Sequence, residues 1–122
     1  MAVFLLSGCG NGKKKIKSCP ADLVYPNDVT ILGHSNDANL FVLRMESADK
    51  SPDELFEFFR EQLQLENWKL TYDSSSENGG ELRFEKENSV TREPRKCTVF
   101  IGAAKNNDEE LLKIDIRCDR GK

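Results

Sequence analysis

The chain has 122 residues and a formal net charge of −3, with 38% hydrophobic and 32% charged residues. This length is enough for one domain with a modest core, and the regular spacing of apolar residues in the second half excludes a disordered chain. Four lysines give residues 1–19 a charge of +4, so residues 20–122 carry −7. An acidic body lacks the basic face that binds phosphate backbones, so no nucleic-acid partner is expected.

The N-terminus joins a short apolar run to a cysteine. Leu6-Ser7-Gly8-Cys9 resembles the lipobox of bacterial lipoproteins, whose usual form is Leu, then Ala or Ser, then Gly or Ala, then Cys. The resemblance implies that residues 1–8 are a signal-peptide remnant that is removed, and that Cys9 carries the lipid. It also implies a lipid anchor in the bacterial cell envelope. Because Gly10 rather than Asp follows the cysteine, it implies the outer membrane if the cell is Gram-negative.

Residues 9–24 are predicted to be a flexible tether between the lipid and the domain. The tether carries a membrane-proximal basic cluster of Lys13, Lys14, Lys15 and Lys17. Near an anionic membrane surface each lysine contributes about 1 kcal/mol of attraction. The alternative is that these lysines only keep the tether solvated, and both interpretations stay open.

Residues 25–122 are predicted to form a single α+β domain. We expect a mostly antiparallel sheet of about five to six strands, with one amphipathic helix packed on one face. The first strand is expected from Val29 to Leu32 and the second from Leu40 to Glu46, with a turn over residues 33–37 between them. That turn contains His34, the only histidine.

Ser51-Pro52-Asp53-Glu54 is the clearest helix start. Ser51 suits the N-cap, Pro52 the first helical position, and Glu54 completes a capping box. The helix should run from Pro52 to about Leu65, with Asn67 as its stop. Its apolar stripe consists of Leu55, Phe56, Phe59 and Leu63, with Phe58 as a further candidate.

A strand from Trp68 to Tyr72 is expected after the helix, with Trp68, Leu70 and Tyr72 on one face. A turn over residues 74–80 then leads to a returning strand that carries Leu82 and Phe84.

The last two strands, residues 97–103 and 111–118, are predicted to form a hairpin. If opposing residue numbers sum to 215, Val99 faces Ile116 and Ile101 faces Ile114, so apolar side chains share one face. The same register sets Cys97 opposite Cys118. Facing strand positions bring Cβ atoms close enough for a disulfide, which we predict here. Cys19 paired with either of them, or three thiols, are the alternatives.

We expect no enzyme, no metal and no cofactor. The cysteine spacings do not match zinc sites, and Cys-x-x-Cys is absent. His34, Ser35 and Asp37 lie in one predicted turn, where they cannot converge as a catalytic triad. The order of strand, helix, Trp-containing strand and terminal meander resembles many small bacterial lipoprotein domains, and this loose resemblance implies no known chemistry.

One helix covers only one face of a sheet, which leaves the other face for binding. That open face is expected to carry Phe100, Leu111, Leu40 and Val42 as a candidate interaction face, unless Leu23–Pro26 covers it. The favoured function is a membrane-anchored, non-catalytic module that docks an envelope protein or another copy of itself. The alternative is a lipid-anchored small-ligand or metal-binding domain, with a deep pocket lined by Trp68, Tyr72 or Phe84.

Overall fold

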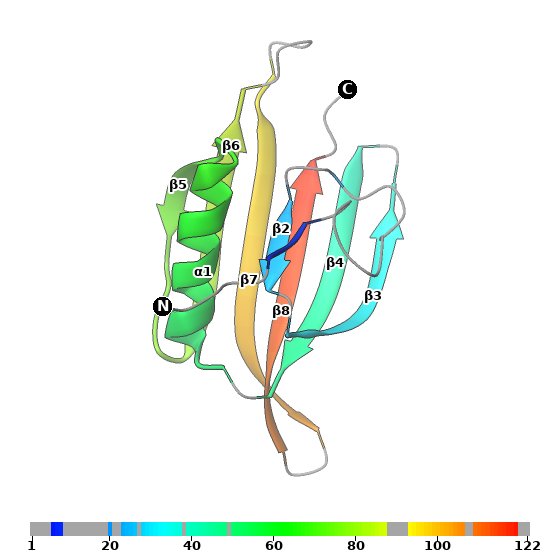
Figure 1. Ribbon diagram of the computed structural model, residues 1–122, viewed down its shortest axis with the longest axis vertical. Coiled ribbons are helices and arrows are strands. Elements are labelled where there is room, and N and C mark those ends of the chain that lie inside the picture. The colour runs from blue at the N-terminus through cyan, green and yellow to red at the C-terminus, as the bar shows by residue number, and fades with distance from the viewer. Residues whose placement is uncertain are drawn as a thin grey trace.

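The computed structural model describes residues 6–8, 20, 23–26, 28–37, 39–48, 50–87, 93–106 and 109–119. These residues form one helix and a six-stranded antiparallel sheet of order β3-β4-β8-β7-β6-β5, which confirms the α+β class (Figure 1). A separate pair joins β1 (Leu6–Gly8) to β2 (Val24–Pro26). The helix is α1 (Pro52–Leu65), and the strands of the sheet are β3 (Thr30–Asn36), β4 (Leu40–Ser47), β5 (Lys69–Asp73), β6 (Gly79–Lys86), β7 (Arg95–Asn106) and β8 (Glu109–Asp119).

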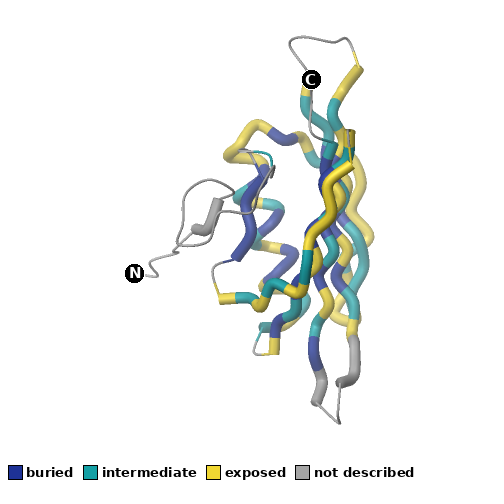
Figure 2. The backbone as a smooth tube through the Cα atoms, turned by 90° about the vertical axis from the view of Figure 1, so that its right-hand side faces the viewer, coloured by how far each residue is buried: buried dark blue, intermediate teal, exposed yellow. Residues whose placement is uncertain are grey.

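The core lies between the sheet and a second layer made of α1 and β2. We call the sheet face toward this layer the inner face and the opposite face the outer face. Helix α1 packs against β5, β6, β7 and β2, while β2 lies over β8, beside the helix (Figures 1 and 2). The buried inner side chains of the four central strands are Phe41, Leu43, Met45, Leu82, Phe84, Cys97, Val99, Ile101, Ile114, Ile116 and Cys118.

Helix α1 has the predicted bounds because both of its ends are encoded locally. The Ser51 hydroxyl accepts from the Glu54 amide at 3.2 Å, and the Glu54 carboxylate accepts from the Ser51 amide at 3.3 Å. This is the predicted capping box. The stripe that points to the sheet is buried as expected and consists of Leu55, Phe56, Phe59 and Leu63.

The end of α1 fixes the position of Trp68. Asn67 adopts a left-handed conformation with φ of 70°. The Asn67 amide donates to the Gln64 carbonyl, and the Trp68 amide donates to the Leu63 carbonyl, both at 3.0 Å. This pair of bonds is a Schellman motif, in which asparagine substitutes for the usual glycine. It turns Trp68 back under the helix, where its side chain is 2% exposed.

The last hairpin has the predicted register. Val99 pairs with Ile116, Ile101 with Ile114, and Cys97 with Cys118. Both strands are longer than expected, because the pairing continues to Asn106 and Glu109. Strand β8 also pairs with β4 along its length, so the last strand lies inside the sheet, between β4 and β7.

The predicted turn over residues 33–37 is wrong. Strand β3 continues through Gly33 and His34 to Asn36, and the chain reverses only after that. A register shift between Ile31 and Gly33 lets the strand bend there without ending. His34 therefore lies in an edge strand, where its ring stacks on Phe41 with centroids 6.1 Å apart.

Candidate functional site

The described part of the chain places both covering elements on the inner face and none on the outer face (Figure 2). Residues 23–26 were the alternative cover for the outer face. They lie on the inner side instead, and Leu23 and Tyr25 belong to the core cluster. Burial raises the pKa of Tyr25. The folded unit therefore extends to Leu23, into residues that the sequence assigned to the tether.

Phe100 is the most exposed of the four predicted face residues. Its side chain is 41% exposed on β7. In the sheet register, Phe100 faces Glu81 of β6 on one side and Asp115 of β8 on the other. The register therefore places an exposed phenyl ring between a glutamate and an aspartate in the middle of the sheet.

The other three predicted residues do not join Phe100 in one apolar patch. Leu40 and Val42 are half-buried neighbours on β4, but the charged residues of β8 separate β4 from β7. Leu111 was expected on the exposed face, yet it is buried, with 9% exposure. The middle of the outer face is therefore charged around Phe100, because β8 carries Asp115 and Arg117 between the apolar positions of its neighbours.

Tyr72 lies on the outer face of the sheet. The prediction that it shares a face with Trp68 and Leu70 is therefore wrong. A register shift between Leu70 and Tyr72 adds one residue to β5 and reverses the alternation. Tyr72 consequently pairs with Arg83, whose guanidinium lies 4.6 Å from the centre of the tyrosine ring. Arg83 also binds Glu81 at 2.9 Å, and this hydrogen bond raises the pKa of Arg83.

The same bulge directs Asp73 toward α1. Asp73 pairs with the inner-facing Leu82, so its carboxylate meets the helix. Arg60 Nε donates to Asp73 Oδ2 at 2.8 Å, and Ser75 donates to the same carboxylate through its amide and its hydroxyl. These contacts lower the pKa of Asp73 to about 2, the Arg60 hydrogen bond contributing most. Sequence reasoning missed this pair because only the bulge brings the two residues together.

We expect the Arg60–Asp73 pair to stabilise the domain by about 1 kcal/mol at neutral pH, since both side chains are partly exposed. A carboxylate with a lowered folded-state pKa stabilises fully above its unfolded value near 4, and this stabilisation is lost as the pH falls toward 2. Urea unfolding of wild type and Asp73→Asn from pH 2 to 7 should show this difference vanish at the acid end. Glu77→Gln, in the same turn, is the control and should change little. An Asp73→Asn effect independent of pH would contradict the assignment.

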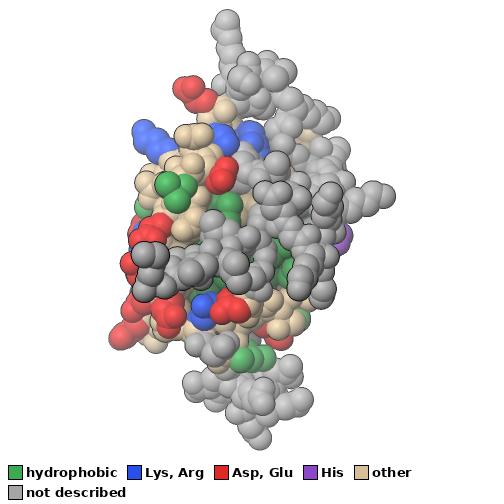
Figure 3. Space-filling view, in the orientation of Figure 1, with side chains coloured by type: hydrophobic (Ala, Val, Ile, Leu, Met, Phe, Trp, Pro, Cys, Tyr) green, Lys and Arg blue, Asp and Glu red, His purple; other side chains and the backbone are tan. Residues whose placement is uncertain are grey.

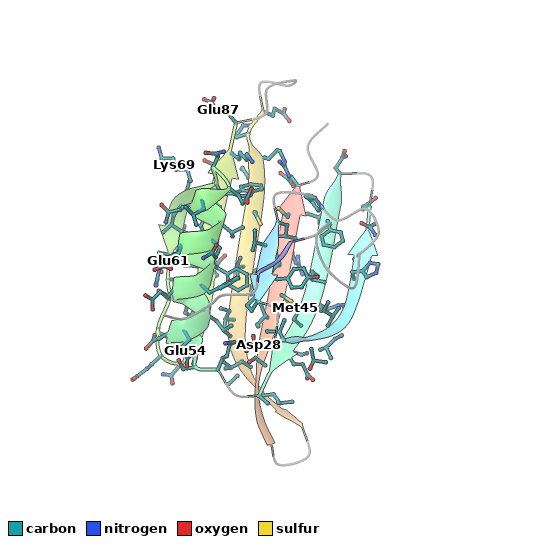
Figure 4. The ribbon with its side chains drawn as sticks, viewed as in Figure 1. Asp28, Met45, Glu54, Glu61, Lys69 and Glu87 are labelled. Atoms are coloured by element: carbon teal, nitrogen blue, oxygen red, sulfur yellow. The ribbon has the colours of Figure 1, made fainter. Side chains whose placement is uncertain are left out.

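Trp68 is covered by two cations at the end of the domain where α1 stops. Lys86 Nζ lies 5.6 Å and the Arg95 guanidinium 4.9 Å from the ring centre. Lys86 also donates to the Glu66 carbonyl at 2.8 Å, at the negative end of the helix. Lys and Arg side chains gather at this end (Figure 3). Lys69 and Glu87 both lie there, while Glu54 lies at the other end of α1 (Figure 4).

An open, shallow depression of about 470 Å³ lies beside Trp68, and its lining is Asn67, Lys69, Glu85, Lys86 and Glu87. Neither Trp68 nor Phe84 lines it, because both are buried in the core, and Tyr72 faces the other side of the sheet. The three aromatic residues predicted to line a deep ligand pocket therefore do not share one.

Cys97 and Cys118 are both buried and occupy opposed positions, as the register prediction required. Cys118 is a thiol in this structure. The disulfide between them stays a prediction about the oxidised protein.

Several predicted residues lie outside the described residues. These are Cys9, Lys13, Lys14, Lys15, Lys17 and Cys19. Within the described ranges, no helix combines the length and the apolar composition that a membrane crossing requires. The same ranges contain no group of three or more His, Cys, Asp or Glu side chains placed to hold a metal ion.

Comparison with known proteins gives one family. A family model described as START domain-like matches residues 28–102, more than half of the chain. The match begins after β2 and ends within β7, so it contains α1 and the strands β3 to β6. No curated protein matches the chain, and no solved structure does.

Proposed function

Since this chain belongs to the START domain-like family, we propose that it is a binding domain rather than an enzyme. It is anchored by lipid at Cys9 in the bacterial cell envelope and docks an envelope protein on the outer face of its sheet. The described residues include one histidine, at an edge strand and stacked on Phe41, and this arrangement does not resemble a catalytic centre.

The anchor is supported by the lipobox-like Leu6–Cys9 and by the lysines that follow it. Acyl chains on Cys9 would be the first attachment, and a basic cluster beside them would be a second one. Four lysines close to anionic head groups would supply about 4 kcal/mol of additional attraction. The proposed anchor therefore combines lipid with an electrostatic contribution.

The observation that carries the docking proposal is the one-sided cover of the sheet. Helix α1 and β2 fill the inner face, and Phe100 stands exposed near the middle of the outer face. The four-residue apolar patch of the sequence prediction is replaced by Phe100 with Glu81 and Asp115 at its sides. A partner that covers this phenyl ring and meets the neighbouring charges would gain both affinity and orientation.

We expect Phe100→Lys to preserve the fold and to weaken partner binding at least about tenfold, as loss of a central aromatic contact does. A lysine at position 100 would lie between Glu81 and Asp115, and these cross-strand pairs of opposite charge would stabilise the folded sheet. Leu65→Lys is the matched control, since Leu65 is 74% exposed on α1, away from the outer face. Cross-linking in intact membranes identifies the partner, and titration with the purified partner gives the affinity. Unfolding by Phe100→Lys, or unchanged binding, would contradict the docking proposal.

Family membership favours a second candidate, a lipid-anchored domain that binds a small ligand. A ligand between the layers would have to displace β2 or α1, because the inner side chains are fully covered. Trp68 is the only tryptophan and lies within that core. A ligand on the inner face would change the fluorescence of Trp68, whereas a protein on the outer face would leave it nearly constant, so this signal distinguishes the two candidates.

A further inference from the structure

Strand β1 is made of residues that the proposed lipid attachment would remove. It consists of Leu6–Gly8, directly before Cys9, and it is the strand partner of β2. In the register, Gly8 faces Val24, Ser7 faces Tyr25, and Leu6 faces Pro26. Within the described residues β2 pairs with no other strand. Cleavage before Cys9 would therefore leave one edge of β2 without its partner.

Removal of β1 leaves backbone groups of β2 without their partners. Leu23, Val24 and Tyr25 are at most 6% exposed while β1 is in place. Backbone N–H and C=O groups that stay shielded from water need hydrogen-bond partners, since an unpaired buried group loses its hydration without compensation. Only alternate residues of an antiparallel strand direct their N–H and C=O groups toward one neighbouring strand, and Pro26 has no N–H, so the donor that loses its partner is the amide of either Val24 or Tyr25. An extended segment that replaces β1 restores the lost bonds.

We infer that the mature protein captures an extended strand of a protein partner on β2, in the place that β1 occupies before processing. This inference rests on the proposed function, because it requires cleavage before Cys9. Backbone pairing would supply the affinity, as in other cases of strand addition to an open edge. The captured strand would be uncharged, because a charge beside the buried Val24 and Tyr25 would be desolvated without a counter-ion. It would carry small residues opposite these two positions, where β1 has Gly8 and Ser7.

The first test compares hydrogen exchange in two forms of the full chain. One is the mature lipoprotein in detergent, whose N-terminus is established by mass spectrometry. The other is Cys9→Ala, which keeps residues 1–8. The one amide of this pair that faces β1, that of Val24 or that of Tyr25, should exchange at least about tenfold faster in the mature form, because no hydrogen bond to β1 has to break first. The amide of Trp68, which is bonded to Leu63 at the end of α1, is the internal control and should not change.

The second test supplies the missing strand in trans. An acetylated peptide with the sequence of residues 3–8 should restore slow exchange at the same amide of the mature form. The same peptide with both Ser7→Pro and Gly8→Pro should not, because one of these two positions donates to β2 and proline cannot donate to the ladder. Equal protection in both forms without peptide would mean that the chain refills the position itself, and it would overturn the inference. So would a failure of the first peptide to bind. An N-terminus that still carries residues 1–8 would instead overturn the proposed anchor, and the inference with it.

Discussion

Cys9→Ala is expected to move the protein from the membrane fraction to the soluble fraction while the domain stays folded. The change removes the acyl chains and leaves only the lysine cluster, whose attraction is weak enough to be screened by salt. Wild type should resist washing with high salt, whereas the variant should be released almost completely. Metabolic labelling with a fatty acid should follow the same pattern, with label in wild type and none in Cys9→Ala.

Cys19→Ala is the matched control for this experiment. It also removes a thiol from the N-terminal segment, but it leaves the lipobox-like sequence intact. It should stay membrane-bound and labelled. Equal labelling of wild type and Cys9→Ala would mean that the lipid is not on Cys9, and the anchor would be disproved.

Phe59→Ala is expected to lower the free energy of unfolding by about 3–5 kcal/mol, because it leaves a cavity between α1 and the sheet. Phe59 is fully buried, and its ring meets the ring of Phe58 edge to face at a centroid distance of 5.3 Å. Domains of this size have about 5–15 kcal/mol of stability in total, so the loss would leave the protein close to unfolding at room temperature.

Phe58→Ala separates cavity formation from the loss of an aromatic contact. Phe58 is only half-buried, so its removal costs the same ring contact but opens less of the core. Urea unfolding should give a loss at Phe58 of less than half that at Phe59. Similar losses at both positions would contradict the placement of α1 on the inner face.

Local signals predicted the helix well. Its capping box and Asn67 both act within a few residues, so the sequence alone contains the information that starts and ends the helix. The last hairpin was predicted for a related reason. Only one register buries the apolar residues of both strands together, and a shift by one residue would bury Lys113 and Asp115 instead.

The errors fall where a distant strand decides the local geometry. The bulges in β3 and β5 depend on the pairing of these strands with β4 and β6. The residues near Gly33 and Thr71 carry no local signal that predicts a bulge. The four candidate interaction residues do not lie side by side, because the order of strands was not predictable from the chain. Val42 and Phe100 would be near neighbours if β4 lay beside β7, but β8 lies between them.

Because β8 lies in the middle of the sheet, it also determines when during synthesis the sheet can be completed. Without this strand, β3 and β4 form one ribbon and β5, β6 and β7 form another, with no strand pairing between the two. Strand β8 closes the gap and is the last strand in chain order, so a molecule emerging N-terminus first cannot finish its sheet until residues 109–119 have been made. If the protein is exported unfolded, as the proposed anchor requires, this late completion would keep the chain open for transport.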